Sequence, residues 1–443
     1  MKKFVLLLLS AAALVTNVPQ LYAKAIFITP GARANSMGAA YIAVANDPTA
    51  SYWNPAGLAQ LARSGAEFSL FYVKNSATSN MSLGNAYPGL GNPKNGDFPL
   101  PRMYSTEPAQ YNSKQFETTA PVPFLAGYHA FDKVTLAGGV YCIGGGGGKW
   151  SDTVAAGVGQ DNINASVDAS YMFMVYNLSA AMEVMPRLSA GFGVDMVTMT
   201  DKQNAKKQYA HQGTGSPSSY GLEIDQNAFG YGVQYNGGLL YRPMDTLRFG
   251  AVMRSGTKIT LHGQAKYNQN GLSWLGSGYA DLQYQTDYDQ NYTYPFTYGL
   301  GVSYDPLPKW TLAAGLDFNQ FSTKRDDVSY NTPLPGVFNT ANADGGWKDT
   351  TQYRIGAEYR PDEKLSLRAG IQTDPSQVRT SDLTLLNLDQ YNMAYYCVGA
   401  GYNFSFATVD LTLVKGISDK PGQAGRSYEY DLDIVRLSVD YSF

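Results

Sequence analysis

Hydrophobic and polar positions alternate over most of the chain, from about Gly65 to the C-terminal residue. The alternating segments are about ten residues long, and turn residues separate them. In the last segment every second residue is apolar, namely Val435, Leu437, Val439, Tyr441 and Phe443. A period of two is typical of a β-strand whose two faces meet different surroundings. The pattern therefore predicts an all-β fold for residues 65–443.

The connections between these segments are short and long in turn, as Asp132–Lys133 and then 144–166 illustrate. Short turns on one rim and long loops on the other are typical of a transmembrane antiparallel β-barrel of the outer membrane. An even number of strands places both chain ends at the periplasmic rim, and the barrel has to close because lipid offers no partner to an open sheet edge. About 14 strands are expected, at 65–74, 120–131, 134–143, 167–184, 188–200, 228–241, 247–267, 280–304, 310–322, 350–359, 365–373, 392–404, 407–416 and 429–443.

Two of the candidate strands, 247–267 and 280–304, are long for a single straight strand. We expect that either of them contains a bulge or a kink.

The N-terminal residues 1–23 have the organisation of a signal peptide. Lys2 and Lys3 precede an apolar run at 4–15, and the small residues Ala23 and Ala25 follow. The run is shorter than the roughly 20 residues that a membrane-spanning helix requires. We expect cleavage after Ala23 or Ala25 and export to the outer membrane; a retained anchor is the alternative.

Residues 24–64 lack the alternation and are rich in small residues. Asp47–Pro48 and Asn54–Pro55 each place a capping side chain before a proline that suits the first turn of a helix. We predict that residues 24–64 form an N-terminal hatch, that is, a plug inside the lumen of the barrel formed by residues 65–443. A disordered periplasmic tail is the alternative, and the apolar residues between Ile42 and Leu61 disfavour it.

The composition agrees with a membrane barrel. Charged residues make up 16% of the chain, compared with about 25% in soluble domains. The mean hydropathy is that of a soluble protein, because a barrel places its apolar residues at every second position only. The formal net charge of −3 indicates no nucleic-acid partner.

Residues with catalytic or metal-binding chemistry are few. The three histidines, His129, His211 and His262, form no recognisable motif with a serine or an aspartate, and their spacing suggests no metal site. We therefore expect no catalytic residues, no metal and no cofactor; an outer-membrane protease or lipase is the alternative. Cys142 and Cys397 lie in separate candidate strands, so we expect free or lipid-facing thiols, with a single disulfide left open.

Several segments resemble, in matching order, those of the FadL/TodX family of outer-membrane transporters for long-chain fatty acids and aromatic hydrocarbons. The segments are 38–41 with 54–58, 248–255 with Lys258 and Gly263, 347–356, and 368–374. The resemblance implies a 14-stranded barrel closed by an N-terminal hatch. It also implies passive transport, in which a hydrophobic small molecule enters from outside, reaches a pocket in the barrel and leaves sideways into the outer-membrane lipid. We expect the protein to act as a monomer.

The resemblance also implies gate residues. The Asn-Pro-Ala turn of the family's hatch lies beside the lateral opening, and Asn54, Pro55 and Ala56 match it. The third strand kinks inward at this opening, and in this sequence the kink falls on a run of glycines, which weaken a strand. These are Gly144, Gly145, Gly146, Gly147 and Gly148, for which an extracellular loop is the alternative.

Three further residues match ligand-binding positions of the family. Phe27 matches an aromatic residue near the mature N-terminus that lines the pocket. Lys324 and Arg325 match one of the basic positions that hold a fatty-acid carboxylate, whereas the other position falls at Ala205.

Two other functions compete with this interpretation. The segment 31–38 is also similar to barrels of the same superfamily that hold protein cargo in type IX secretion; the segments from 248 to 374 favour transport instead. A general aqueous porin is the third possibility, and a plug in the lumen argues against it.

Overall fold

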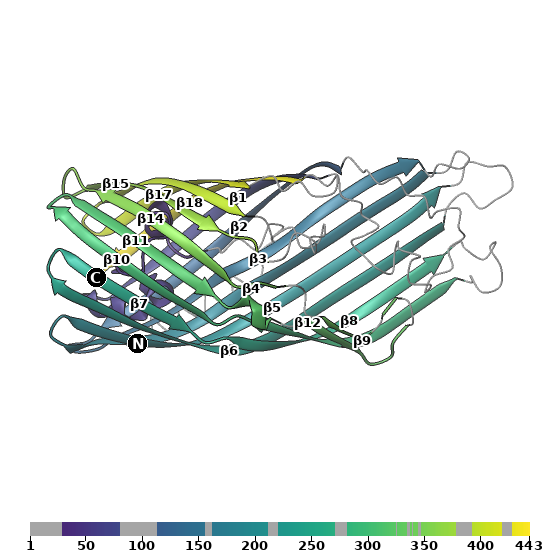
Figure 1. Ribbon diagram of the computed structural model, residues 1–443, viewed down its shortest axis with the longest axis horizontal. Coiled ribbons are helices and arrows are strands. Elements are labelled where there is room, and N and C mark those ends of the chain that lie inside the picture. The colour runs from purple at the N-terminus through teal and green to yellow at the C-terminus, as the bar shows by residue number, and fades with distance from the viewer. Residues whose placement is uncertain are drawn as a thin grey trace.

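The computed structural model is one closed antiparallel β-barrel (Figure 1). It describes residues 29–79, 113–155, 162–210, 220–270, 281–324, 326–334, 337–338, 340–343, 347–377, 392–418 and 428–443, and every structural statement below concerns these residues. The strands are β1 (Gly65–Ser79), β2 (Ser113–Ala130), β3 (Thr135–Ala155), β4 (Asn162–Met185), β5 (Leu188–Ala210), β6 (Tyr220–Met244), β7 (Leu247–Arg254), β8 (Thr257–Asn270), β9 (Leu282–Tyr294), β10 (Thr297–Leu307), β11 (Trp310–Asn319), β12 (Asp326–Tyr330), β13 (Ala341–Ala343), β14 (Thr350–Tyr359), β15 (Leu365–Asp374), β16 (Met393–Asn403), β17 (Ala407–Ser418) and β18 (Tyr428–Ser442).

The wall of the barrel contains 14 strands, which confirms the predicted fold. β7 and β8 together form one of them, as do β9 and β10, whereas β12 and β13 lie in the connection from β11 to β14. Both interruptions lie inside the ranges that were predicted to contain a bulge or a kink. β1 pairs with β18, with Gly65 opposite Ser442, so the sheet has closed on itself.

The connections at the rim where β1 begins and β18 ends are short. Examples are Pro186–Arg187 between β4 and β5, and Pro308–Lys309 between β10 and β11. Arg187 has a positive φ of 68° and donates from its side chain to the carbonyl of Pro243, which joins two neighbouring turns. Longer connections follow at the opposite rim, as the alternation predicted.

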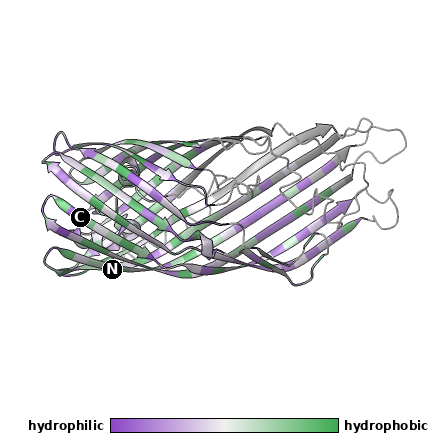
Figure 2. Cartoon of the chain, viewed as in Figure 1, coloured by the Kyte–Doolittle hydropathy of each residue, from purple (hydrophilic) through white to green (hydrophobic). Residues whose placement is uncertain are grey.

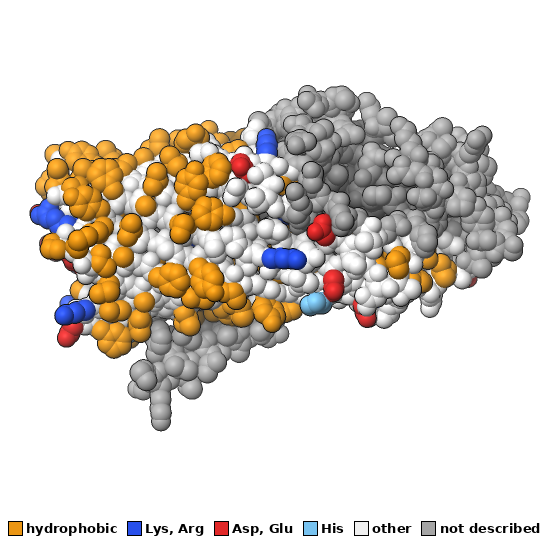
Figure 3. Space-filling view, turned by 60° about the horizontal axis from the view of Figure 1, so that its bottom comes forward, with side chains coloured by type: hydrophobic (Ala, Val, Ile, Leu, Met, Phe, Trp, Pro, Cys, Tyr) orange, Lys and Arg blue, Asp and Glu red, His pale blue; other side chains and the backbone are white. Residues whose placement is uncertain are grey.

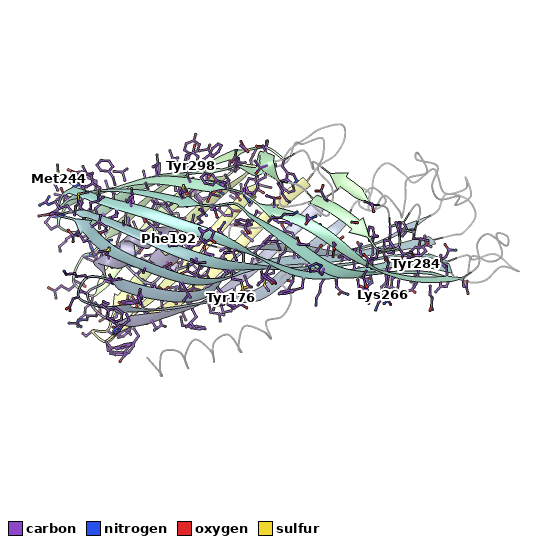
Figure 4. The ribbon with its side chains drawn as sticks, turned by 90° about the horizontal axis from the view of Figure 1, so that it is seen from below. Tyr176, Phe192, Met244, Lys266, Tyr284 and Tyr298 are labelled. Carbon is purple, nitrogen blue, oxygen red and sulfur yellow. The ribbon has the colours of Figure 1, made fainter. Side chains whose placement is uncertain are left out.

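The strands differ greatly in length around the barrel. β3 to β6 contain 21 to 25 residues, whereas β11, β14 and β15 contain ten each. One side of the wall therefore projects far beyond the other, as Figure 1 shows. Met244 lies at the short-turn rim, whereas Lys266 and Tyr284 lie on the projecting part (Figure 4).

The two faces of each strand differ as the sequence pattern predicted, but the apolar face points outward. In β4 the outward Leu178 is 69% exposed, whereas the neighbouring Asn177 is 3% exposed. Apolar side chains form a broad band on the outside of the wall near the short-turn rim, and charged groups lie at the rim and on the projecting part (Figure 3). Colouring by hydropathy shows the same change along the strands (Figure 2). Lipid covers an apolar band of this kind.

Some polar side chains on the inside form hydrogen bonds with one another from strand to strand. The Asp195 carboxylate on β5 accepts a hydrogen bond from Asn177 on β4 at 2.5 Å and one from Asn236 on β6 at 2.7 Å. These bonds join three adjacent strands inside the barrel. Among the described residues, no helix is long and apolar enough to cross a membrane.

We predict that the mature protein fractionates with outer membranes and migrates as a heat-modifiable band in gel electrophoresis. A closed sheet without a free edge resists detergent until it is heated, and the unfolded chain then migrates differently. Fractionation and electrophoresis with and without boiling test this. Recovery as a soluble periplasmic protein would contradict the barrel.

Candidate functional site

The segment that precedes β1 lies inside the barrel, at the short-turn end (Figure 1). It contains α2 (Ala32–Ser36), α3 (Ala50–Trp53) and the 3₁₀ helix η1 (Pro55–Gln60). Its large side chains Tyr41, Trp53 and Leu58 are almost completely buried, and they form a small apolar core with residues of the wall. The Trp53 indole N–H donates to the carbonyl of Pro30 at 3.0 Å. This segment, Thr29–Ser64, is called the hatch below.

Buried ion pairs attach the hatch to one side of the wall. Arg33 of α2 lies 3.0 Å from the Glu358 carboxylate on β14. Arg368 on β15 lies 2.6 Å from Glu358 and 2.5 Å from Asp410 on β17. Removal of one member of a buried ion pair typically costs about 3–5 kcal/mol, because the remaining charge is left uncompensated. The hatch and three wall strands therefore share one network of charges.

A second polar group lies within the hatch. The Tyr41 hydroxyl donates to the Asp47 carboxylate. Burial raises the pKa of Tyr41 well above its ordinary value, so the hydroxyl stays protonated as a donor. Asp47 also accepts from the backbone N–H of Thr49, but α3 begins only at Ala50. The predicted helix start at Pro48 is therefore two residues too early.

The Asn-Pro-Ala turn begins η1 as the sequence predicted. The Asn54 side-chain oxygen accepts from the backbone N–H of Ala56 at 3.1 Å, and Pro55 occupies the first position of the helix. The Asn54 amide group also donates to the carbonyl of Ile42 at 2.9 Å and to that of Leu239 on β6 at 3.0 Å. One buried side chain therefore caps η1, joins two parts of the hatch and binds the hatch to the wall.

Glycines in the wall strands allow the backbone of the hatch to approach the wall closely. A Cβ atom at Gly238 on β6 would lie 2.0 Å from the Asn54 side-chain oxygen. A Cβ atom at Gly370 on β15 would lie 2.2 Å from the backbone nitrogen of Gly38. These positions were not predicted, although glycines at inward-facing places of predicted strands are the signal in the sequence that could have revealed them.

The ladder of the wall is incomplete between β2 and β3. Among the described residues these strands pair only from Ala130–Thr135 to Phe124–Tyr141. Beyond that point β2 continues to pair with β1, and β3 continues to pair with β4 as far as Ala155. The two edges therefore separate, and the wall is unpaired here.

The glycine run begins close to this separation. A bulge interrupts the β3–β4 register between Cys142 and Gly144, and Gly144, Gly145, Gly146, Gly147 and Gly148 then pair with β4 from Phe173 to Ala169. The predicted third strand, 134–143, was too short, because β3 runs through all five glycines. The alternative of an extracellular loop is wrong, because the glycines are part of a strand.

Aromatic side chains meet where the hatch, β3 and the separation are close together. The Tyr141 ring lies 5.8 Å from the Tyr52 ring of α3 and 5.7 Å from the Phe124 ring on β2. Arg254 on β7 also packs on Tyr52, with its guanidinium 4.5 Å from the ring centroid, and donates to the Tyr52 carbonyl. The cavity beside them measures about 30 Å³, which leaves room for one or two water molecules.

An apolar cluster covers the inner wall on the long-loop side of the hatch. Its members include Phe71, Phe124, Tyr141, Val175 and Ile434, from five different strands. The inside of the barrel is therefore polar around the hatch and apolar between the hatch and the long-loop rim.

Lys324 lies in an aromatic setting after η7 (Phe321–Thr323). Its ammonium group is 3.3 Å from the centroid of the Trp347 ring and 4.3 Å from that of Tyr292, and the side chain is buried. Arg325 and Phe27, the other predicted ligand-binding residues, lie outside the described residues.

A protein-family model matches this chain over most of its length. The model of a family described as "Outer membrane protein transport protein (OMPP1/FadL/TodX)" matches residues 15–424. The chain belongs to this family. It lies in the outer membrane, and the match favours transport over the type IX secretion alternative.

Solved structures of other proteins share the fold of this FadL/TodX-family barrel. A Pseudomonas aeruginosa FadL homologue superimposes with a TM-score of 0.69 at 16% identity, over 95% of this chain and 100% of the other. The P. putida toluene transporter TodX gives 0.68 at 16% identity, over 94% and 99%. The CymD monoaromatic hydrocarbon channel gives 0.59 at 17% identity, over 94% and 98%. Among curated protein sequences, no match is found.

The thiols and imidazoles of this family member form no catalytic cluster among the described residues. Cys142 and Cys397 are free, as one of the expectations held, but both are buried on the lumen side and do not face lipid. His129 lies 2.7 Å from the Ser64 hydroxyl, and His262 lies 2.7 Å from Asp289 on the projecting part of the wall. Both pairs are exposed and lie apart from each other. No group that could hold a metal is found among the described residues.

A large hollow lies on the outside of the barrel wall. It measures about 1130 Å³ and spans β10 to β18. Tyr353, Ile355 and Ile371, which line it, are 50–67% exposed and face away from the lumen. Membrane lipid covers this surface, so the hollow is separate from the interior site.

We predict that Gly238→Val displaces the hatch without preventing barrel assembly. The valine side chain would overlap Asn54, whereas a Cβ atom at the neighbouring Gly237 would make only an ordinary van der Waals contact, with the Gly191 carbonyl oxygen at 3.9 Å. Gly237→Val, which adds an apolar group to the lipid-facing side, is therefore the matched control.

Trypsin digestion with N-terminal sequencing measures the effect. We expect cleavage after Arg33 in folded, heat-modifiable Gly238→Val and protection in the wild type and Gly237→Val. Equal protection in all three proteins would show that the hatch does not depend on this close approach.

Proposed function

We propose that the protein conducts hydrophobic small molecules passively across the outer membrane and releases them sideways into the bilayer through the separation of β2 and β3. The observation that carries this proposal is the end of the β2–β3 ladder at Phe124–Tyr141, beside an apolar interior. Relatives of the same fold are a toluene transporter and a monoaromatic hydrocarbon channel. Long-chain fatty acids and aromatic hydrocarbons are the two substrate classes we consider.

The route has three parts. The ligand enters from the long-loop rim, passes into the apolar cluster beyond the hatch, and leaves between the edges of β2 and β3. Such a path never requires an apolar molecule to cross the water of the periplasm, which suits a solute that water disfavours. The energy source is the concentration gradient alone.

The exit is closed in the present conformation. The cavity beside Tyr52 and Tyr141 is smaller than any of the proposed ligands. The hatch has to move, or Tyr52 and Tyr141 have to rotate, before a ligand can pass. Asn54 and Pro55 lie next to Gly238 on β6, Ala56 lies next to Gly191 on β5, and together they hold η1 in place, so we assign them to the gate.

The glycine run forms the other side of the gate in this proposal. Strand backbone that faces lipid must be paired or covered. Gly144 to Gly148 are paired on the β4 side only, and they add no side chains that would narrow the gap. Glycine also adopts the backbone conformations of a bulge more readily than other residues.

The chain divides into three segments with different roles. We propose that residues 1–23 are the signal peptide, residues 24–64 the hatch and residues 65–443 the barrel. One barrel contains the entire route, so we expect the functional unit to be a monomer. Phe27, Lys324 and Arg325 stay proposed contacts of the ligand.

We predict that Asn54→Ala and Pro55→Ala lower uptake of a hydrophobic substrate but leave the barrel assembled. Loss of the cap costs about 1 kcal/mol, which is small for a barrel and large for a hatch of this size. Uptake of radiolabelled oleate and of toluene by cells that lack their own carriers measures the effect, and heat-modifiability controls for assembly. Normal uptake by both variants would reject a gating role of this turn.

We predict further that Gly146→Arg blocks release and leaves ligand binding to the purified barrel unchanged. A long charged side chain at the unpaired edge fills the gap, whereas Gly146→Ala adds one methyl group and serves as the control. Binding in detergent and uptake by cells are measured on the same variants. If uptake of Gly146→Arg equals that of Gly146→Ala, the exit lies elsewhere.

A further inference from the structure

Arg436 on β18 is a buried cation that makes no direct ion pair among the described residues; the carboxyl of Glu67 on β1 acts on it only from beyond hydrogen-bonding distance. Its side chain points into the lumen and is 2% exposed. One terminal nitrogen donates to the carbonyl of Thr29 at 2.5 Å, and the guanidinium carbon lies 4.2 Å from the centroid of the Phe71 ring. The Nε atom is buried and has no hydrogen-bond partner. Among the described residues, no carboxylate forms an ion pair with it.

Four other inward-facing arginines differ from Arg436 in this respect, whereas Arg254 packs on the Tyr52 ring. Arg33 and Arg368 share Glu358, and Arg354 lies 2.5 Å from Asp317. Arg248 on β7 lies 3.0 Å from Asp305. A buried cation without a direct ion pair is unfavourable, and an anionic ligand at Arg436 would supply the missing partner.

The surroundings of Arg436 change from polar to apolar along the strands. On the inner face of β1 and β18, Glu67 and Asp440 lie opposite each other nearest the rim, followed by Ser69 and Ser438, and then by Phe71 and Arg436. Farther from the rim the inner face is apolar, with Val73, Leu432 and Ile434 all buried. Arg436 is therefore the last charged residue before the apolar part of this wall.

A second donor beside Arg436 also lacks a partner. The Ser69 hydroxyl is completely buried and makes no hydrogen bond. Ser69 lies on the same face of β1 as Phe71, which is opposite Arg436. A guanidinium Nε–H and a hydroxyl are suitable donors for the two oxygens of a carboxylate.

We propose that Arg436, with Ser69, binds the anionic head group of an amphipathic ligand, a hydrophobic carboxylate whose tail lies along Val73, Leu432 and Ile434. The proposal rests on the proposed function, because it assumes that hydrophobic molecules enter this lumen. It makes Arg436 the residue that distinguishes a hydrophobic acid from a neutral compound with the same tail. The site is separate from Lys324, whose ammonium group lies between Trp347 and Tyr292.

The test compares cis-parinaric acid with its methyl ester, which differ only in the charge of the head group. Fluorescence titration of the purified full-length barrel in a nonionic detergent at neutral pH gives both affinities. We expect the wild type to bind the acid about tenfold more tightly than the ester, as a charge-assisted pair of hydrogen bonds implies. Arg436→Gln should lose this preference and keep the affinity for the ester, and Arg436→Lys should keep part of the preference.

Two control variants make the result specific. Arg248→Gln removes an inward-facing arginine that already has an acidic partner, and we expect it to keep the wild-type preference for the acid. Lys324→Met tests the position that the family resemblance suggested. The proposal is wrong if Lys324→Met abolishes the preference and Arg436→Gln retains it, or if the wild type binds acid and ester equally well. If the wild type binds neither compound nor toluene, the proposed function itself fails.

A measurement on the wild type keeps the test valid if Arg436→Gln does not assemble. A fatty acid with a diazirine next to its carboxyl group is bound and photolysed, and the cross-linked peptides are identified by mass spectrometry. We expect cross-links to residues 67–73 or 432–438. Cross-links confined to the peptide that contains Lys324 or Trp347 would overturn the proposal.

Discussion

Backbone hydrogen bonding in lipid is the constraint on which the rest of this structure depends. A strand edge inside the bilayer has no water to pair with, so the sheet has to close, and β1 therefore meets β18 in continuous register. The same constraint makes the incomplete ladder between β2 and β3 informative. A separation there is stable only if other groups cover the freed edges, and the hatch with Tyr52 lies behind it.

Closure of the sheet around a small lumen in turn explains the hatch. The inside of the wall is polar near the short-turn rim, and each buried polar group needs a partner. Arg33 and Asn54 of the hatch supply such partners to Glu358 and to the carbonyl of Leu239. The backbone of the hatch can come close enough only where the wall has no side chain, as at Gly238 and Gly370. Charge and close packing thus act together to hold a short, loosely helical segment in one place.

Much of the barrel could be predicted from the sequence, because a period of two and a regular sequence of short turns are local signals. The interruptions near Ser255 and Pro295 could also be predicted, because the two candidate strands that contain them are long for a single straight strand. It is harder to predict which face of each strand points into the lumen. Alternation separates the two faces, but it does not show that Gly238 lies on the face that meets the hatch. The continuation of β3 through Gly148 depends on pairing with β4, a partner that residue propensity does not reveal. The position of Arg436 is likewise a property of the assembled lumen, since the absence of a direct ion pair among the described residues becomes visible only when the strands are side by side.

The small size of the cavity beside Tyr52 has a consequence for the cell. Among the described residues, the space between the hatch and Tyr141 accommodates one or two water molecules, which is too little for a water column at this point. On the proposed route, selection therefore occurs by partition and not by sieving: a solute passes in proportion to its preference for apolar surroundings, and the permeability barrier that protects the periplasm stays intact while the solute crosses it.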